Sequence, residues 1–326
     1  MSAGIDPGCV RLRLAVAAGR IVAVDVRSER PALAPALRGR LADEAARLVP
    51  LLFALCGKAQ GRAAVLALAA ARGEECAVHL DETVQAEVMR EHLWRWLLDL
   101  PPLLGAVALR EEFVAAAGWA ASGQLSQLAA LLYGPQIEAL CQRLGDAEDV
   151  SAAVTHCLPP MDAQASLMLW PQFDAEFCRT PHWQGAAAET GALARQQGRA
   201  GSVGTAAHGA CAARWLARLA ELRDWAGEGT GVGAGGTASA VQVAPGRGRA
   251  LVETARGLLM HEIALDGERI VDYFIVAPTE WNFHPQGPLA GWLLGRDASD
   301  RDAVHGFAAR AVAALDPCVR WELEWL

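Results

Sequence analysis

The sequence predicts an α+β fold in which a helical core is accompanied by small β-hairpin regions near the N-terminus and toward the C-terminus. Residues 10–26 alternate between apolar and polar side chains, which is the pattern of half-buried strands. Helical patterns then dominate to about residue 225, and residues 250–277 return to strand-like runs. This order predicts one domain over residues 1–326 whose two ends meet.

The N-terminal region is predicted to be a β-hairpin. Arg11 and Arg13 separate apolar residues that occupy every second position over 10–16, so one face of this strand is apolar. Residues 17–20 supply a turn, and residues 21–26 form the return strand.

Helices are predicted for most of the middle of the chain. The clearest covers residues 85–100, where Val88, Leu93 and Trp96 recur near the helical period, and Pro101–Pro102 is expected to end it. The other predicted helices cover residues 43–55 with a kink or restart at Pro50, 63–71, 120–144 with a break near Gly134–Pro135, 211–225 and 302–315.

A glycine-rich break separates the helical region from the second β region. Residues 231–236 match G-x-G-x-x-G as letters, but that phosphate-binding motif needs a strand before it and a helix after it. Here a predicted helix precedes the string and a strand-like run follows, so we interpret it as a loop. Beyond it, apolar runs at 258–265 and 270–276 flank a turn at 266–269, which predicts a hairpin.

The composition excludes several classes of function. The net charge is −8, whereas binding to nucleic acid requires a basic surface, so no nucleic-acid partner is expected. No apolar run approaches the ~18 residues of a membrane span, and the N-terminus lacks the pattern of a signal peptide. The eight cysteines are too sparse for a disulfide framework. We therefore expect a cytoplasmic protein with no membrane partner.

Two cysteines near opposite ends of the chain stand in motif-like contexts. Cys56 precedes Gly57, which lets a metal approach the backbone, and the neighbouring Lys58 is expected to lower the pKa of the thiol. Cys318 follows Asp316–Pro317, a pair that fixes a turn and presents the sulfur. A free cysteine is often only a small apolar core residue, and that alternative stays open.

Five stretches, the two cysteine motifs among them, together resemble the large, catalytic subunit of nickel–iron hydrogenases. The motifs of that family are CGxC, P-R-Y-x-G followed by E-V-G-P-L-A-R, A-P-R-G, V-P-S/T-T-W-N and D-P-C-x-x-C-x-x-H. The matching stretches, in the same order, are LCGKA at 55–59, PHWQG at 181–185 with ETGALAR at 189–195, TARG at 254–257, VAPTEWN at 276–282 and DPC at 316–318. The resemblance implies a hydrogenase large-subunit-like helical core.

The departures from the family pattern fall at the nickel site. The family holds nickel with four thiolates, and the second cysteine of each pair falls here on Ala59 and on Trp321. The family's histidines fall on Ala63 and Glu324. A soft-ligand site that lacks half of its thiolates cannot bind nickel in the same way. The resemblance therefore implies a protein that is not an enzyme and in which no nickel is expected.

The positions around the iron are retained. In the family, iron carries two cyanides and one carbon monoxide, and an arginine and a hydroxyl donate hydrogen bonds to the cyanides. Arg256 and Thr279 match these residues, and Asp316 matches the acid that pairs with the arginine. A fixed guanidinium and a hydroxyl in a dry pocket suit metal-bound cyanide. Ordinary roles stay open, namely a strand-edge surface arginine for Arg256 and a turn cap for Thr279.

This combination resembles the hydrogenase expression/formation proteins of the HupK/HoxV type. It implies a scaffold that carries the Fe(CN)2CO fragment transiently on Cys56 and Cys318. The implied partners are a HypC-type chaperone, the machinery that supplies cyanide and carbon monoxide, and the apo large subunit. Both cysteines match terminal nickel ligands, so the fragment lies displaced toward the vacated nickel position or a chaperone cysteine completes the site.

Two other interpretations remain. The first is a degenerate large-subunit homologue that binds no iron and acts as a structural or regulatory partner. Convergence of Arg256, Thr279 and the two cysteines is the feature that separates it from the carrier. The second is a working hydrogenase, which the missing thiolates disfavour.

Overall fold

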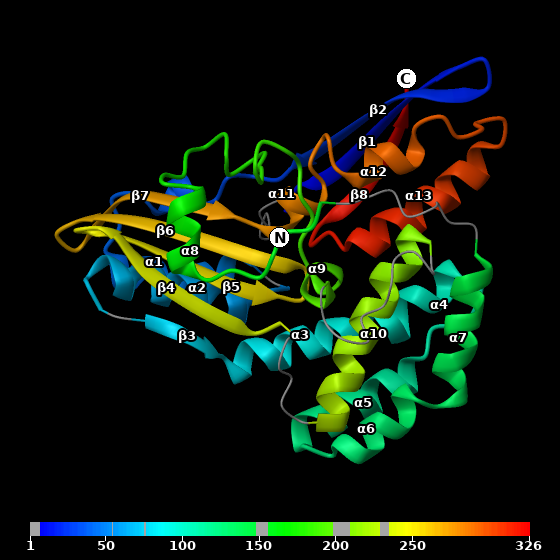
Figure 1. Cartoon of the computed structure of the whole chain (residues 1–326), viewed down its shortest axis with the longest axis horizontal. Helices are drawn as coiled ribbons and strands as arrows, with labels where there is room; N and C mark the ends of the chain where they lie inside the picture. Colours follow the sequence, from blue (N-terminus) through cyan, green and yellow to red (C-terminus); the bar gives the residue numbers. More distant parts are fainter. Residues whose placement is uncertain (1–6, 54, 75, 148–155, 198–208, 229–234) are drawn as a thin grey trace, which may run out of the picture.

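The computed structural model describes residues 7–53, 55–74, 76–147, 156–197, 209–228 and 235–326 (Figure 1). Its strands form two sheets, a three-stranded sheet of order β2-β1-β8 and a five-stranded sheet of order β3-β4-β5-β6-β7. The strands are β1 (Cys9–Ala17), β2 (Arg20–Glu29), β3 (Cys76–Leu80), β4 (Thr237–Ala244), β5 (Arg247–Thr254), β6 (Gly257–Asp266), β7 (Arg269–Val276) and β8 (Arg320–Trp325). The predicted α+β class is confirmed.

The helices occupy the middle of the chain and its C-terminal quarter. They are α1 (Ala42–Leu52), α2 (Gly57–Ala71), α3 (Glu82–Trp94), α4 (Leu100–Leu103), α5 (Arg110–Ser122), α6 (Leu125–Leu132), α7 (Pro135–Asp146), α8 (Ala163–Leu169), α9 (Ala192–Gln196), α10 (Ala210–Glu228), α11 (Pro278–Asn282), α12 (Pro288–Leu293) and α13 (Arg301–Leu315), with a 3-10 turn at Ala34–Leu37 and a π-helical turn at Arg95–Asp99. None of the described helices is both long enough and apolar enough to cross a lipid bilayer.

The predicted N-terminal hairpin is confirmed. β1 and β2 pair antiparallel, and their two-residue turn places Ala18 at φ 49° and Gly19 at φ 74°. Positive φ at both central residues matches the twist of the strands, and Gly19 adopts it without steric cost.

The last residues of the chain form a strand that the sequence analysis did not identify. β8 pairs parallel with β1, from Cys9 opposite Arg320 to Leu14 opposite Trp325. The two ends of the chain therefore meet, as expected, and β8 holds the segment just after Cys318 against the N-terminal hairpin (Figure 1).

The predicted hairpin at 258–276 forms as β6 and β7, but it is half of a larger sheet. β4 and β5 precede it, and β3 pairs with β4 at the far edge. The first eight residues of β6 are buried because α2 packs on one face of the sheet and α8 covers part of the other (Figure 1). Burial on both faces explains why this strand is a continuous apolar run and does not alternate.

The expected helix end at Pro101–Pro102 is wrong. α3 continues through the π-helical turn into α4, which carries both prolines in its first turn. Proline is tolerated there because the first N–H groups of a helix have no intrahelical acceptor. The break near Gly134–Pro135 is confirmed, since Gly134 caps α7 and Pro135 is its first residue. Residues 229–234, with most of the glycine-rich string, lie outside the described residues.

Gly248 in β5 determines how closely α2 approaches the sheet. A Cβ at this position would lie 2.2 Å from the carbonyl oxygen of Ala67 and 2.2 Å from the amide nitrogen of Ala71. Backbone atoms cannot move aside as a flexible side chain can, so Gly248→Ala is expected to lower the free energy of unfolding by about 1–3 kcal/mol. Urea-induced unfolding measures this change.

The control for this prediction is Gly118→Ala. Gly118 lies inside α5, and a Cβ there would have no neighbour within 4 Å. Alanine has the higher helix propensity, so this variant should keep or raise the stability. Equal unfolding midpoints for the two variants would contradict this account of the packing.

Candidate functional site

The two candidate metal-binding thiols lie at the ends of helices. Cys56 is the N-cap residue of α2, and Cys318 follows the C-terminal end of α13. The Thr279 hydroxyl, in the first turn of α11, lies 3.3 Å from Cys318 Sγ. Gln60 Nε2 lies 3.8 Å from Cys56 Sγ. Each thiol therefore has a polar side chain as its neighbour.

The surroundings of Cys56 oppose ionisation of its free thiol. Burial first, and then the charges of Cys318 and Glu87, raise the pKa of Cys56 to about 12, although Arg256 and Arg30 oppose the rise. The charges of Cys318, Arg256 and Arg30 thus act together on the sulfur of Cys56, and we refer to these four residues with Thr279 as the two-thiol pocket.

The prediction that Lys58 lowers the pKa of Cys56 is wrong. The Lys58 side chain is exposed, and burial of the neighbouring thiol outweighs any effect of its charge. The backbone amides of Lys58 and Ala59 donate instead to the Glu87 carboxylate, at 2.9 and 3.1 Å, which caps α2 with a negative charge. Gly57 is required for a local reason, since a Cβ there would lie 2.9 Å from the carbonyl oxygen of Pro50.

Arg256 lies in the turn between β5 and β6 and is almost fully buried. Its Nη2 donates to Glu91 Oε2 at 2.9 Å, and its Nε lies 3.4 Å from Asp316 Oδ1. Burial lowers the pKa of Arg256, but Asp316, Glu91 and the two thiols together raise it above its ordinary value. The guanidinium stays charged, and Glu91 is its closer partner.

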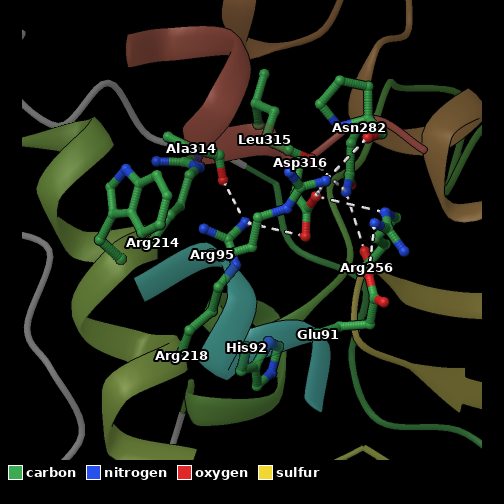
Figure 2. Close-up of polar contacts among 12 residues, drawn as sticks. Glu91, His92, Arg95, Arg214, Arg218, Arg256, Asn282, Ala314, Leu315 and Asp316 are labelled. Carbon is green, nitrogen blue, oxygen red and sulfur yellow. Dashed lines mark hydrogen bonds and ion pairs between the residues drawn. The ribbon is translucent and has the colours of Figure 1, made fainter. Parts of the chain in front are cut away.

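Asp316 is the centre of a buried cluster of arginines. It caps α13 in the left-handed conformation, at φ 57°, and is 1% exposed. Arg95 Nη2 lies 2.6 Å from Oδ1, and Arg218 Nη2 lies 4.0 Å from Oδ2 (Figure 2). Burial alone would raise the pKa of Asp316, but Arg256, Arg95 and Arg218 hold it well below its usual range.

Asn282 fixes the backbone on which Arg256 stands. Its Nδ2 donates to the carbonyl oxygen of Arg256 at 3.1 Å (Figure 2). Its Oδ1 accepts from the amide of Thr190 at 2.9 Å. This residue therefore ties α11, the β5–β6 turn and the segment before α9 together. Through these contacts Asn282 holds backbone segments in place, which is a structural role.

Glu91, Arg95 and Arg218 are site residues that the sequence motifs do not identify. The helix at 85–100 is predicted from its apolar positions alone. Glu91 and Arg95 lie four residues apart on this helix, close in sequence to the buried side chains of Val88 and Trp96. Charged residues on the apolar face of a predicted helix were the available signal, because such residues are rarely buried without a partner.

The two cysteines by themselves do not make a complete metal site. Over the described ranges, no three His, Cys, Asp or Glu side chains are grouped so that they could hold a metal ion. A metal bound by Cys56 and Cys318 would need further ligands, either its own or a partner's.

The fold defines the class of protein. The chain has the fold of nickel–iron hydrogenase large subunits. It superposes on the reduced Ni-Fe-Se hydrogenase of Desulfovibrio vulgaris Hildenborough with a TM-score of 0.66 and 16% identity, covering 93% of this chain and 94% of that chain. The enzyme of Desulfomicrobium baculatum gives a TM-score of 0.62 at 14% identity, covering 94% and 95%.

Curated relatives define the family more narrowly. HoxV of Cupriavidus necator is 33% identical over 92% of both chains. HupK of Bradyrhizobium diazoefficiens is 32% identical over 93% of this chain and 92% of the relative, and HupK of Rhizobium leguminosarum is 31% identical over 98% and 97%. No protein-family model matches. The chain belongs to the HoxV/HupK family of hydrogenase expression/formation proteins, as the resemblance implied.

Proposed function

We propose that this protein acts in nickel–iron hydrogenase maturation as a non-enzymatic carrier of the Fe(CN)2CO fragment. Its curated relatives are named hydrogenase expression/formation proteins, which supports a role in maturation. The observation that carries the finer proposal is the contact between the Thr279 hydroxyl and Cys318 Sγ, together with the electrostatic coupling of both thiols to Arg256. Thiol, hydroxyl and guanidinium are the groups that iron and metal-bound cyanide require.

The chemistry of the pocket suits a bound unit that is negatively charged. Iron replaces the proton of each thiol, which offsets the raised pKa of Cys56. Arg256 uses Nη2 for Glu91, while its buried Nε, 3.4 Å from Asp316 Oδ1, has no hydrogen-bond partner within the described residues. This nitrogen supplies a donor for a cyanide, and the Thr279 hydroxyl supplies a second donor.

The fold supports the proposed partners. Because the chain has the fold of the large subunit, a HypC-type chaperone of that subunit and the cyanide- and carbon-monoxide-supplying machinery would load it. The apo large subunit would then receive the fragment. Ala59 and Trp321 leave no second pair of thiolates, so no stoichiometric nickel and no hydrogen oxidation are expected.

Infrared spectroscopy tests the proposed function. The protein is purified from cells with active hydrogenase maturation, and its spectrum is recorded where metal-bound cyanide and carbon monoxide absorb and polypeptide does not. Two cyanide bands and one carbon monoxide band, with iron but no nickel by metal analysis, support the carrier.

A structural or regulatory partner without iron is the second candidate function. It is favoured by the lack of a third metal-ligating side chain beside the two cysteines in the described residues. This second function would be established if the purified protein binds the maturation machinery but contains no iron, cyanide or carbon monoxide.

Replacing Arg256 with lysine is expected to reduce retention of the fragment. Lysine keeps the charge but lacks the planar fork that contacts Glu91, Asp316 and a cyanide together. A charge-assisted hydrogen bond contributes about 1.5–3 kcal/mol, so the infrared intensity per folded protein should fall about ten- to a hundredfold.

The matched control is Arg249→Lys. Arg249 is fully buried and bonded to Glu262 at 2.6 and 2.9 Å, on the central sheet and away from the thiols. Arg249→Lys also removes a buried guanidinium, but Arg249 is not part of the two-thiol pocket. Loss of the bands in both variants would assign the effect to stability and not to recognition.

A further inference from the structure

A second buried arginine belongs to the two-thiol pocket, and neither the sequence motifs nor the resemblance assigns it a role. Arg30 follows β2, and its Nη1 pairs with Glu280 Oε1 at 3.0 Å. The two side chains are only 13% and 12% exposed. Ser28 Oγ donates to the other carboxylate oxygen of Glu280 at 2.8 Å, so the pair is held at both oxygens.

The Arg30–Glu280 pair is joined to the thiol pocket through α11. Glu280 is the next residue after Thr279, whose hydroxyl lies 3.3 Å from Cys318 Sγ. The pair also lines a cavity of about 140 Å³ whose wall includes Phe53, three residues before Cys56. Arg30 therefore lies on the wall of this cavity, and its partner Glu280 is next in sequence to the residue whose hydroxyl contacts Cys318 Sγ.

The electrostatics agree with this placement. Burial lowers the pKa of Arg30, but the charges of Cys318, Glu280 and Cys56 raise it above its ordinary value. The same two thiols act on Arg256, which reaches the pocket from the β5–β6 turn. Two guanidiniums from different elements are thus electrostatically coupled to the same pair of thiols.

We propose that Arg30, positioned by Glu280 and Ser28, is a second cationic recognition residue of the two-thiol pocket and selects an anionic metal–thiolate unit over a neutral one. The inference rests on the proposed function. An Fe(II) ion with two cyanides, one carbon monoxide and two thiolates carries a double negative charge, whereas a bare divalent ion with the same thiolates is neutral. A buried cation near such a unit attracts the anionic form, and low local polarity strengthens that attraction.

The test compares Arg30→Gln with Arg38→Gln. Arg38 lines the same cavity but is 51% exposed and pairs with Asp272 at 2.7 Å. The protein is purified from maturation-competent cells. Arg30→Gln is expected to lower the cyanide and carbon monoxide intensity per folded protein at least tenfold and to shift the remaining cyanide bands. Arg38→Gln should match the unmodified protein, and Arg30→Lys should recover part of the intensity because it keeps the charge.

A second measurement separates recognition from support of the fold. The metal-free protein is titrated with Cd²⁺, followed by its thiolate charge-transfer absorption. Because the cadmium bis-thiolate is neutral, Arg30→Gln should leave its affinity within about twofold of the unmodified protein.

Three outcomes would overturn the inference. Unchanged infrared bands in Arg30→Gln would do so while the proposed function stands. A parallel loss of Cd²⁺ affinity would reduce Arg30 to a structural support of the thiols. Absence of the bands in the unmodified protein would contradict the proposed function and remove this inference with it.

Discussion

Replacing Cys56 or Cys318 with alanine is expected to remove the cyanide and carbon monoxide infrared bands completely. Each substitution deletes a metal–thiolate bond, and within the described residues no other Cys, His, Asp or Glu is grouped with the pair to replace it. Loss of one of two protein ligands leaves the fragment attached to a single side chain, which purification would strip. The measurement is band intensity per mole of folded protein, with circular dichroism to confirm the fold.

Cys157→Ala is the matched control for this prediction. Cys157 is also a partly buried free thiol, and burial raises its pKa to about 12 as it does for Cys56. It lies beside Glu189 and takes no part in the contacts of Thr279 or Cys318. Undiminished bands in both Cys56→Ala and Cys318→Ala would favour the structural-partner interpretation.

The local parts of the fold could be predicted because short-range physics determines them. Alternation over 10–26 and the Ala18–Gly19 turn specify the first hairpin, and the apolar runs around 266–269 specify β6 and β7. β8 could not be predicted in the same way. Its charged residues, Glu322 and Glu324, are stabilised by Arg11 and Arg13 of β1, more than 300 residues away.

The site was predicted as a set of residues but not as an electrostatic arrangement. Motif order predicts Cys56, Arg256, Thr279 and Cys318 as site residues; in the structure Thr279 contacts Cys318, and Cys56, Cys318 and Arg256 are electrostatically coupled. The neighbouring Lys58 predicts a lowered pKa for Cys56, whereas the pKa is raised. A neighbour in sequence can be exposed while the thiol itself is buried. Burial is a property of the whole fold, and so it cannot be read from the residues on either side.

Asp316→Asn is expected to be the most destabilising single substitution in the buried charge cluster. Asparagine keeps the size of the side chain but leaves Arg95, Arg218 and Arg256 without their shared carboxylate. Removing one member of a buried ion cluster costs about 3–5 kcal/mol, because the remaining charges stay buried and uncompensated. Asp25→Asn, in a partly exposed pair with Arg27, should change the stability by no more than about 1 kcal/mol.

The same substitution should change the response of the protein to acid. The arginines hold the pKa of Asp316 below its ordinary value, so the carboxylate stabilises the folded state fully above the unfolded pKa of about 3.9. That contribution is lost as the pH falls from there toward the lower pKa of the folded state. Urea unfolding between pH 7 and pH 3 should therefore show a constant difference between the unmodified protein and Asp316→Asn above about pH 5, and a narrowing difference below about pH 4. A difference that stays constant to pH 3 would show that Asp316 does not act through its charge.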